Sequence, residues 1–306
     1  MRIESGAKFG RPRRWITVAF AVLVALGIAE LSLRGLGLLV ATPGDAPGRD
    51  GEFLVLCVGD SWTHGLQFRS YGEALEEKLN ARNPGRVRVV RAGVPGQNSS
   101  QGLHRLEALL SHYDPDLLIV LLGNNDHQNL AESEYWKFDD DAESRLNLWS
   151  ARLRVGLHSL RLFKVTRNLW LTASNRQTPD EFFSVEDVEI SPNIRATAVD
   201  PVTHDRLLRH NLTRVIEIAR GQDVELLFMN YFYFHGYHVN ETIVDVATEH
   251  RVPLVNNTVS FHERISPEQR GDYLYGGHPT TRGHGFIADN IIEVLERNGS
   301  DLLASH

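Results

Sequence analysis

The stretch of sequence that decides the fold is Val55-Leu56-Cys57-Val58-Gly59-Asp60-Ser61-Trp62. Its apolar first half predicts a buried strand of a parallel sheet, and the Gly-Asp-Ser that follows ends this strand. Ligands of open α/β sheets bind just beyond the carboxyl ends of the strands, and Ser61 occupies such a place in the pattern. Because Gly-Asp-Ser is also common turn composition, the stretch alone leaves a simple strand-ending turn open.

Strands and helices alternate along the rest of the domain. Apolar runs typical of strands follow at 87–90, 117–122, 224–229 and 252–255, and helical spacing of apolar residues occurs at 71–79, 103–110, 204–220, 239–250 and 286–295. The run 117–122 is the most apolar of these, as expected of a central parallel strand. The alternation predicts an α/β fold, a three-layer α/β/α sandwich around a central parallel sheet.

Composition excludes some classes of function. The chain has 306 residues and a net charge of −7, so its charge gives no support to nucleic-acid binding. The one cysteine, Cys57, lies inside the apolar run before Gly59 and is interpreted as a small core residue. A single cysteine cannot form an intrachain disulfide, so the redox compartment stays open.

The amino terminus differs from everything after it. Residues 1–14 carry five basic side chains, and residues 15–29 carry no charge. The apolar character continues to Val40, which gives a helix long enough to cross a bilayer of ~30 Å. This pattern predicts a transmembrane anchor at 15–40, with the basic flank in the cytoplasm and the rest of the chain on the periplasmic or extracellular side. A cleaved signal peptide also fits the basic start and apolar middle.

The chain after the anchor predicts a linker and one domain with an insertion. Residues 41–51 are rich in proline and glycine, and the domain is expected to extend over 52–300. Between about 130 and 201 the strand and helix pattern is interrupted by an acidic run and an arginine-containing amphipathic stretch. This insertion is interpreted as a helical cover over the sheet edge, a substrate-side lid, a partner surface or a membrane-surface contact.

Four polar loops recur at the ends of strands or before the last helix, and they carry Ser61, Gly96, Asn125 and His278. Acyl transfer to water requires a hydroxyl nucleophile, a base that takes its proton, and donors aimed at the developing oxyanion. These four residues supply those groups, although each alone is also compatible with an ordinary turn or surface residue.

With these loops the sequence resembles the SGNH (GDSL-type) hydrolase family, whose members have a flavodoxin-like α/β/α fold. The resemblance covers roughly 52–126 and 270–297, and it rests on four short blocks: Gly59-Asp60-Ser61, Arg91-Ala92-Gly93-Val94-Pro95-Gly96, Gly123-Asn124-Asn125-Asp126 and His278-Pro279. Two positions depart from the family pattern without touching the mechanism: Trp62 stands where leucine is common, and Arg91 stands where asparagine often opens the second block.

The resemblance implies a serine esterase mechanism. Ser61 would attack the ester carbonyl and His278 would accept its proton and return it to the leaving alcohol. The Ser61 and Gly96 backbone N–H groups and the Asn125 amide would hold the oxyanion, and water would cleave the acyl-serine. No metal or organic cofactor is expected, since the histidines and acids follow no ligand pattern such as His-Glu-x-x-His.

A third departure concerns the acid that supports the histidine. Family members usually carry an aspartate three residues before it, and this position is Tyr275 here. We predict that Asp272 takes this role, because the two glycines before His278 allow the chain to fold back. The alternatives are a Ser-His pair supported by Tyr275 or a backbone carbonyl, and a site that has lost hydrolysis.

The predicted activity is hydrolysis of O-acetyl or other short acyl groups on a polysaccharide or a lipid. An O-acetyltransferase that uses the same acyl-serine, and a non-catalytic relative that binds glycan or scaffolds a membrane complex, are the alternatives. The expected partners are the ester substrate and, through the N-terminal helix, the membrane. The pattern does not determine the acyl chain length or the oligomeric state.

Overall fold

The computed structural model describes residues 12–40, 51–82, 84–127, 129–139, 145–163, 165–166, 169, 183–185, 188–190, 200–233 and 238–299. The chain divides into two compact units. The first consists of Met1–Gly44 and Leu157–Gln177, and the second consists of Asp45–Gly156 and Thr178–His306. The predicted linker 41–51 falls almost entirely outside the described residues.

The first unit contains the long helix α1 (Pro12–Val40). Its segment Trp15–Arg34 has a mean hydropathy of 2.3, so α1 is long and apolar enough to cross a membrane, a criterion that a signal sequence also meets. Near its far end the Glu30 carboxylate accepts hydrogen bonds from Arg34 and from the backbone N–H groups of Arg161 and Leu162. The start of the segment after residue 157 is therefore bonded to the helix within one unit.

The second unit is built on a five-stranded parallel sheet in the order β2-β1-β3-β6-β7. The strands are β1 (Phe53–Gly59), β2 (Val87–Gly93), β3 (Leu117–Leu121), β6 (Glu225–Met229) and β7 (Leu254–Val255). The central strands are apolar because helices cover both faces of the sheet, and every residue of β3 is buried. The order reverses between β1 and β3, which is the point where open α/β sheets bind their ligands.

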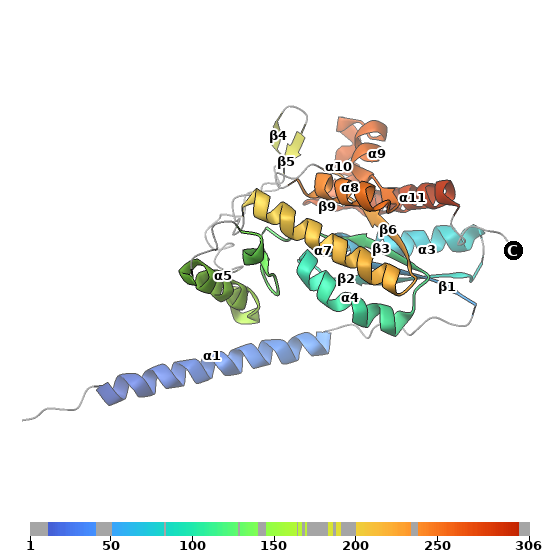
Figure 1. Ribbon diagram of the computed structural model, residues 1–306. Helices are drawn as coiled ribbons and strands as arrows, with labels where there is room; N and C mark the ends of the chain where they lie inside the picture. Colours follow the sequence, from blue (N-terminus) through green and yellow to red (C-terminus); the bar gives the residue numbers. More distant parts are fainter. Residues whose placement is uncertain are drawn as a thin grey trace, which may run out of the picture. The chain divides into compact units, whose positions relative to one another are not determined.

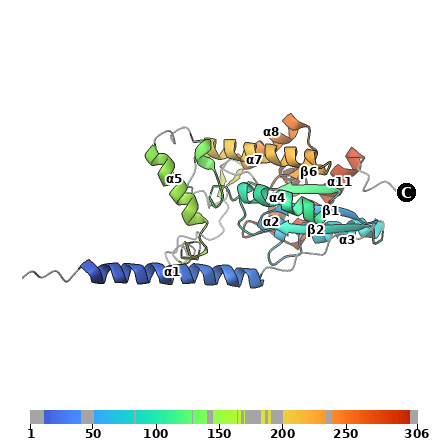
Figure 2. The ribbon, with the colours of Figure 1, turned by 60° about the horizontal axis from the view of Figure 1, so that its bottom comes forward.

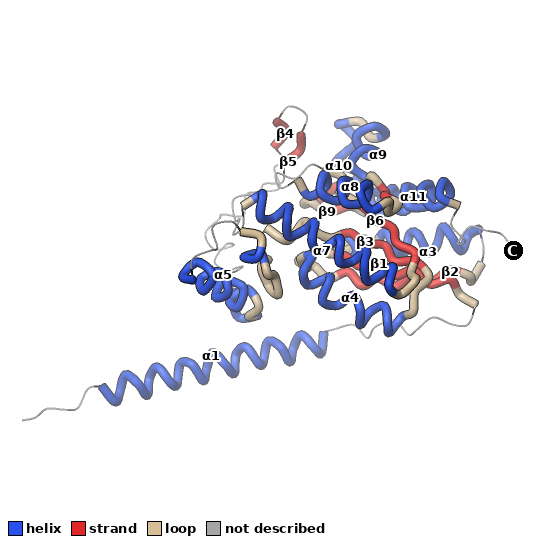
Figure 3. The backbone as a smooth tube through the Cα atoms, viewed as in Figure 1, coloured by secondary structure: helices blue, strands red, loops and turns tan. Residues whose placement is uncertain are grey.

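Helices cover both faces of this sheet, as Figures 1 and 2 show. On one face α3 (Tyr71–Arg82) packs against α11 (Thr281–Asn298), and on the other α4 (Ser99–Tyr113), α7 (Pro201–Gly221) and α8 (Val239–His250) pack together. Figure 3 shows the strands between these two layers of helices. The predicted three-layer α/β/α sandwich is confirmed, and α3, α4, α7, α8 and α11 match the predicted helical patterns.

Shorter elements complete the second unit near the carboxyl ends of the strands and around the last helix. They are α2 (Ser61–His64), α9 (Asn257–Arg264), η4 (Pro267–Gln269), α10 (Arg270–Tyr273), β8 (Leu274–Tyr275) and β9 (His278–Pro279). The strands β8 and β9 form a small antiparallel hairpin directly before α11. This hairpin and α2 are the elements that carry the His-Pro and Gly-Asp-Ser blocks.

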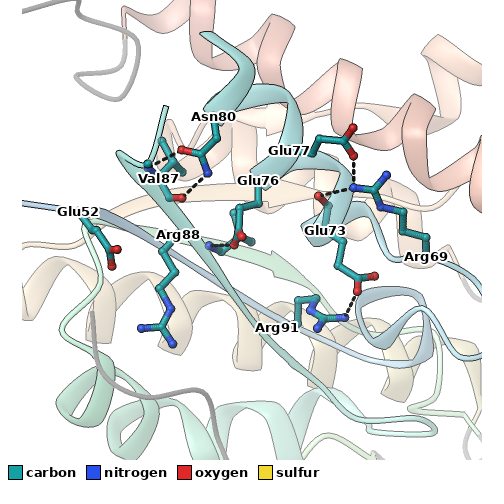
Figure 4. Close-up of a pocket in the computed structure, with 11 residues that line it drawn as sticks. Glu52, Arg69, Glu73, Glu76, Glu77, Asn80, Val87, Arg88 and Arg91 are labelled. Carbon is teal, nitrogen blue, oxygen red and sulfur yellow. Dashed lines mark hydrogen bonds and ion pairs between the residues drawn. The ribbon is translucent and has the colours of Figure 1, made fainter. Parts of the chain in front are cut away.

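The free edge of the sheet at β2 is blocked by side chains of α3. Asn80 donates to the Val87 carbonyl and accepts from the backbone N–H of Val87, and Glu76 accepts from the backbone N–H of Val89 (Figure 4). An unpaired strand edge would otherwise be a template for pairing with another chain. The charged depression of about 640 Å³ at this edge is lined by Asn80 and Glu76 among others, and Ser61 is not among its lining residues.

The predicted insertion contains η1 (Tyr135–Lys137), α5 (Arg145–His158), β4 (Phe183–Val185) and β5 (Val188–Ile190). A small apolar cluster of Leu130, Tyr135 and Ala151 packs against Leu207 of α7. Much of the range 140–199 lies outside the described residues, so the four interpretations of this insertion stay predictions.

Candidate active site

Ser61 lies at the first position of α2, directly after β1, and is only 8% exposed. The sequence pattern allowed a simple turn here, but the structure has a four-residue helix whose N-cap is Asp60. The Asp60 carboxylate accepts a hydrogen bond from the Trp62 backbone N–H at 2.9 Å. An N-cap of this kind satisfies a backbone donor that the short helix leaves unpaired, and so it fixes the backbone of Ser61.

His278 is brought to Ser61 across 217 residues of sequence. Its Nε2 lies 2.9 Å from Ser61 Oγ, and its Nδ1 lies 2.8 Å from the Gly276 carbonyl oxygen. A carbonyl oxygen can only accept, so Nδ1 carries the proton and donates it to Gly276. In the neutral imidazole Nε2 is then the unprotonated nitrogen and accepts the hydrogen bond of the Ser61 hydroxyl, which is the arrangement that a general base requires.

The two glycines before His278 form the turn of the β8–β9 hairpin. Gly276 and Gly277 have φ angles of 56° and 73°, and Tyr275 pairs with His278 across the hairpin. A two-residue hairpin turn with positive φ at both central positions is of type I′, and glycine adopts it without steric cost. The turn aims the Gly276 carbonyl back at the imidazole that follows it.

The structure differs from the prediction for Asp272. Its carboxylate is 62% exposed and is bound by Arg282 at 2.8 Å, whereas Nδ1 of His278 is paired with the Gly276 carbonyl. The reason is the register of the hairpin, in which the Thr280 N–H and hydroxyl bond to the carbonyls of Tyr273 and Asp272. This pairing holds Asp272 beside the start of α11, away from the turn that reaches His278.

Tyr275 is not the partner of Nδ1 either, because Nδ1 is paired with the Gly276 carbonyl. Its side chain is 65% exposed, and its ring packs edge-on against Phe68 at 6.4 Å between centroids. Of the partners weighed from the sequence, the backbone carbonyl is the one that the structure places on Nδ1.

Asn125 lies in the turn after β3, and it is brought next to Asp60 and the loop after β2. Its Nδ2 is 3.2 Å from Asp60 Oδ2 and 3.1 Å from the Gln97 carbonyl oxygen. Gln97 in turn donates from its side chain to the Gly59 carbonyl at 3.1 Å. The structure therefore joins the blocks that carry Ser61 and Asn125 to the loop that carries Gly96.

Gly96 occupies an exposed turn next to Gln97. Its φ of 72° is a left-handed conformation that favours glycine, and its carbonyl accepts a hydrogen bond from Asn129 Nδ2 at 2.7 Å. Open space surrounds the position where a Cβ would stand. The backbone conformation, and not crowding, is thus the reason for glycine at this position.

Buried acids lie behind this side of the site. Burial raises the pKa of Asp60 to about 6, although hydrogen bonds from the Trp62 N–H and the Tyr231 hydroxyl lower it. Burial likewise raises the pKa of Asp126 to about 7, against the hydrogen bonds that Ser99 donates to it. Two buried histidines shift the other way: burial lowers the pKa of both His204 and His284 to about 4.

Sequence reasoning missed several residues that organise the site. Asp60 was noted only as a member of its block, and Trp62 only as a departure from the family pattern. Tyr231 and Tyr233, which follow β6, were not singled out, yet Tyr231 bonds Asp60 and Tyr233 bonds the Gly277 carbonyl. The available signal was an aromatic run at the carboxyl end of an apolar strand, where side chains of α/β sheets face ligands.

A depression of about 570 Å³ opens beside His278. It is lined by His64, Leu66, Gln67, Phe68, Tyr275, Gly276 and His278. Apolar and aromatic side chains line ligand sites of this size, and a few polar groups orient the ligand there. The described residues thus place a mostly apolar depression next to His278 of the Ser61–His278 pair.

The chain is similar to known acylhydrolases. A 72-residue segment is 39% identical to "Thioesterase 1/protease 1/lysophospholipase L1" of Escherichia coli strain K12, covering 24% of this chain and 34% of that protein. The psychrotrophic esterase EstA from Pseudoalteromonas sp. superposes with a TM-score of 0.47 at 13% identity, covering 82% of this chain and all of the esterase. An acetyl xylan esterase superposes with a TM-score of 0.49 at 15% identity, over 79% of this chain and 99% of its own.

The family is established by a longer match. The sequence pattern of the GDSL-like lipase/acylhydrolase family matches residues 57–286, a range that includes Ser61, Gly96, Asn125 and His278. The chain thus belongs to the GDSL-like lipase/acylhydrolase (SGNH-type) family.

Proposed function

We propose that this enzyme cleaves its ester through an acyl-serine on Ser61, with His278 as general base and then general acid. The observation that carries the proposal is the 2.9 Å contact between Ser61 Oγ and His278 Nε2. The hydrogen bond from Nδ1 to the Gly276 carbonyl holds the imidazole in the tautomer that accepts the serine proton.

In the first half of the reaction Ser61 Oγ attacks the carbonyl carbon while its proton passes to His278 Nε2. The tetrahedral oxyanion takes hydrogen bonds from the backbone N–H groups of Ser61 and Gly96 and from the Asn125 amide. The Asn125 amide exchanges its bond to the Gln97 carbonyl for one to the oxyanion and keeps its bond to Asp60. Collapse breaks the bond to the alkoxide oxygen, which leaves with the proton from His278.

In the second half water replaces the alcohol. Its proton passes to His278 Nε2 as its oxygen attacks the acyl carbon, and collapse of the second intermediate returns the proton to Ser61 Oγ. The products are the free acid and the regenerated serine. A sugar hydroxyl in place of water would make the same acyl-serine an intermediate of O-acetyl transfer.

The proposed substrate carries O-acetyl or other short acyl groups on a polysaccharide or lipid. The depression beside His278 supports an uncharged substrate group, because Leu66, Phe68 and Tyr275 line much of it. The similarity to a protein whose name includes lysophospholipase keeps lipid esters among the substrates to test.

We also propose that α1 is a retained membrane anchor, with the hydrolase domain on the outer side. The basic residues before the apolar segment favour this orientation. The bonds of Glu30 to the backbone of Arg161 and Leu162 support retention, since cleavage after the apolar segment would remove the acceptor of both N–H groups. A reporter fused after His306 should be active only outside the cytoplasm, and the full chain should resist extraction by salt and alkali.

The direct test of the catalytic proposal uses the full chain in detergent. A fluorophosphonate probe should label the wild type, and the protein should hydrolyse p-nitrophenyl acetate. The Ser61→Ala variant should lose labelling and about 10⁶-fold in turnover. Wild-type activity in this variant would refute the assignment of Ser61.

A further inference from the structure

An aromatic segment follows β6 and lies against both halves of the candidate site. Tyr231, Phe232 and Tyr233 are almost completely buried. One neighbour of β6 in the sheet is β3, whose carboxyl end leads to Asn125, so the segment starts at the same edge as the active-site turns. Three consecutive buried aromatic side chains therefore lie at the edge of the sheet where the active-site turns lie.

Tyr231 contacts the half of the site that holds the oxyanion donors. Its hydroxyl donates to Asp60 Oδ2 at 2.9 Å, and this same oxygen accepts from Asn125 Nδ2. The Tyr231 hydroxyl also accepts the backbone N–H of Asn124 at 3.4 Å. Tyr231 therefore holds both the carboxylate that orients the Asn125 amide and the turn that carries Asn125.

Tyr233 contacts the other half, the hairpin of His278. Its hydroxyl donates to the Gly277 carbonyl at 3.1 Å. Trp62 Nε1 donates to the same oxygen, also at 3.1 Å, and a carbonyl oxygen has two lone pairs for the two donors. The peptide that joins Gly277 to His278 is thus fixed by two side chains from elsewhere in the fold.

The Trp62 ring links these contacts. It packs edge-on against the rings of Tyr231, Phe232 and Tyr233, with centroids 5.2, 5.2 and 5.6 Å away. Aromatic edge-to-face contacts add to the burial of the rings and fix their relative orientation. Since Trp62 directly follows the nucleophile, one packed cluster connects the serine, the oxyanion side and the base side.

We propose that Tyr231 and Tyr233 are positioning residues with separate tasks, Tyr231 for the oxyanion donor Asn125 and Tyr233, together with Trp62, for the general base His278. The inference rests on the function proposed for Ser61 and His278. A carboxylate attracts an imidazolium through charge, whereas a neutral backbone carbonyl stabilises it only when its lone pair points at Nδ1. The two hydrogen bonds to Gly277 keep the glycine turn in the conformation that aims the Gly276 carbonyl in this way.

The two tasks predict different dependence on the leaving group. Expulsion of an alkoxide needs the proton of His278, whereas p-nitrophenolate leaves without one. A substitution that displaces His278 therefore slows hydrolysis of an alkyl ester more than hydrolysis of an activated ester. A substitution that displaces Asn125 slows hydrolysis of both esters by the same factor, because the same tetrahedral oxyanion forms from each.

The experiment compares kcat/KM for p-nitrophenyl acetate and ethyl acetate in the full chain at pH 8, above the range in which Asp60 titrates. Tyr233→Phe and Trp62→Phe should each lose about tenfold on the activated ester, as expected for one hydrogen bond, and at least threefold more on the ethyl ester. Tyr231→Phe should lose about tenfold on both. Tyr113→Phe, which removes a hydroxyl at the far end of α4, is the matched control and should stay within twofold.

Thermal unfolding of each variant separates positioning from loss of fold, and Trp62→Phe provides a second base-side variant in case Tyr233→Phe does not fold. The same leaving-group ratio in Tyr231→Phe and Tyr233→Phe would overturn the division of tasks, and wild-type rates in both would overturn the roles altogether. Absence of Ser61-dependent turnover in the wild type would instead overturn the proposed function, and the inference with it.

Discussion

The proposed oxyanion side and the proposed base side of the site are supported in different ways. On the oxyanion side, Asn125 follows the fully buried central strand β3, and the buried carboxylate of Asp60 holds its amide. On the base side, His278 opens a two-residue strand of a small hairpin, and a neutral carbonyl from a glycine turn holds its imidazole. A carboxylate thus accepts a hydrogen bond from the proposed oxyanion donor Asn125, whereas a neutral carbonyl accepts one from the proposed base His278.

Among the described residues, the Ser–His geometry is thus kept with a backbone carbonyl, and not an acid, on Nδ1 of the histidine. On the proposed oxyanion side, Asp60 and Asn125 lie in turns that follow buried strands, and the Asn125 amide is held by Asp60 and the Gln97 carbonyl. The base side lies beyond the sheet and depends on the Gly276–Gly277 turn and on the donors to Gly277. We therefore expect substitutions on the two sides to differ in size and in kind.

The largest effect is expected for the contact between Ser61 and His278. His278→Ala should reduce kcat by about as much as Ser61→Ala, about 10⁶-fold, because the serine loses its base. The double variant should be no slower than either single variant, since the two residues act as a unit. Ester hydrolysis and fluorophosphonate labelling check this, and additive losses in the double variant would show that the residues act separately.

On the oxyanion side, Asn125→Ala should reduce kcat by ~10²–10³ and leave KM nearly unchanged, because the amide donates to charge that exists only in the transition state. Steady-state kinetics on p-nitrophenyl acetate measure both constants. Asn124→Ala in the same turn is the matched control and should change kcat less than about threefold. A rise of KM at constant kcat would identify Asn125 as a substrate-binding residue instead.

The buried carboxyl group of Asp126, which accepts hydrogen bonds from Ser99, makes the stability of the protein depend on pH. The folded-state pKa of Asp126 is about 7, above its unfolded value of ~3.9, so the folded state binds the proton more tightly and stability falls as pH rises between these values. An asparagine side chain does not titrate, so Asp126→Asn removes this loss of stability with rising pH. Relative to wild type, its free energy of unfolding should therefore rise between pH 4.5 and pH 8, by of order 2–4 kcal/mol.

Urea titrations of the full chain at the two pH values measure this difference. Comparison with wild type is essential, because His204 and His284, with pKa values lowered to about 4, make stability rise with pH over part of the same range. The exposed carboxylate of Asp245 provides the control: Asp245→Asn should show almost the same pH dependence as wild type. An Asp126→Asn curve parallel to wild type would contradict the prediction.

The smallest effect is expected on the base side at Asp272. Asp272→Asn should change kcat less than threefold, because the carboxylate pairs with Arg282 and does not reach the imidazole. The exposed ion pair should contribute less than about 1 kcal/mol to stability. A loss of a hundredfold or more in turnover would restore Asp272 as the acid of the site and remove the contrast between the two sides.

Much of the fold was predictable because its signals are local. The apolar runs at β1, β2, β3, β6 and β7 and the helical spacing between them each depend on neighbouring residues, and all were recognised. The four residues Ser61, Gly96, Asn125 and His278 were found through short blocks, each at the end of a strand or before the last helix. Nearness in sequence favoured Asp272 as the acid, whereas the hairpin register pairs its segment with Thr280 and Arg282, and the Gly276 carbonyl lies on Nδ1 of His278.

The sequence by itself determined the alternation of strands and helices, the apolar N-terminal segment and the chemical groups available at the sheet edge. These features depend only on the periodicity and the type of the residues. Only the tertiary structure decided which groups meet: Asp60 with Tyr231, Gly277 with Trp62 and Tyr233, and His278 with the Gly276 carbonyl. Most of these partners lie far apart in the chain, and each hydrogen bond depends on backbone angles and register that residue type alone leaves open.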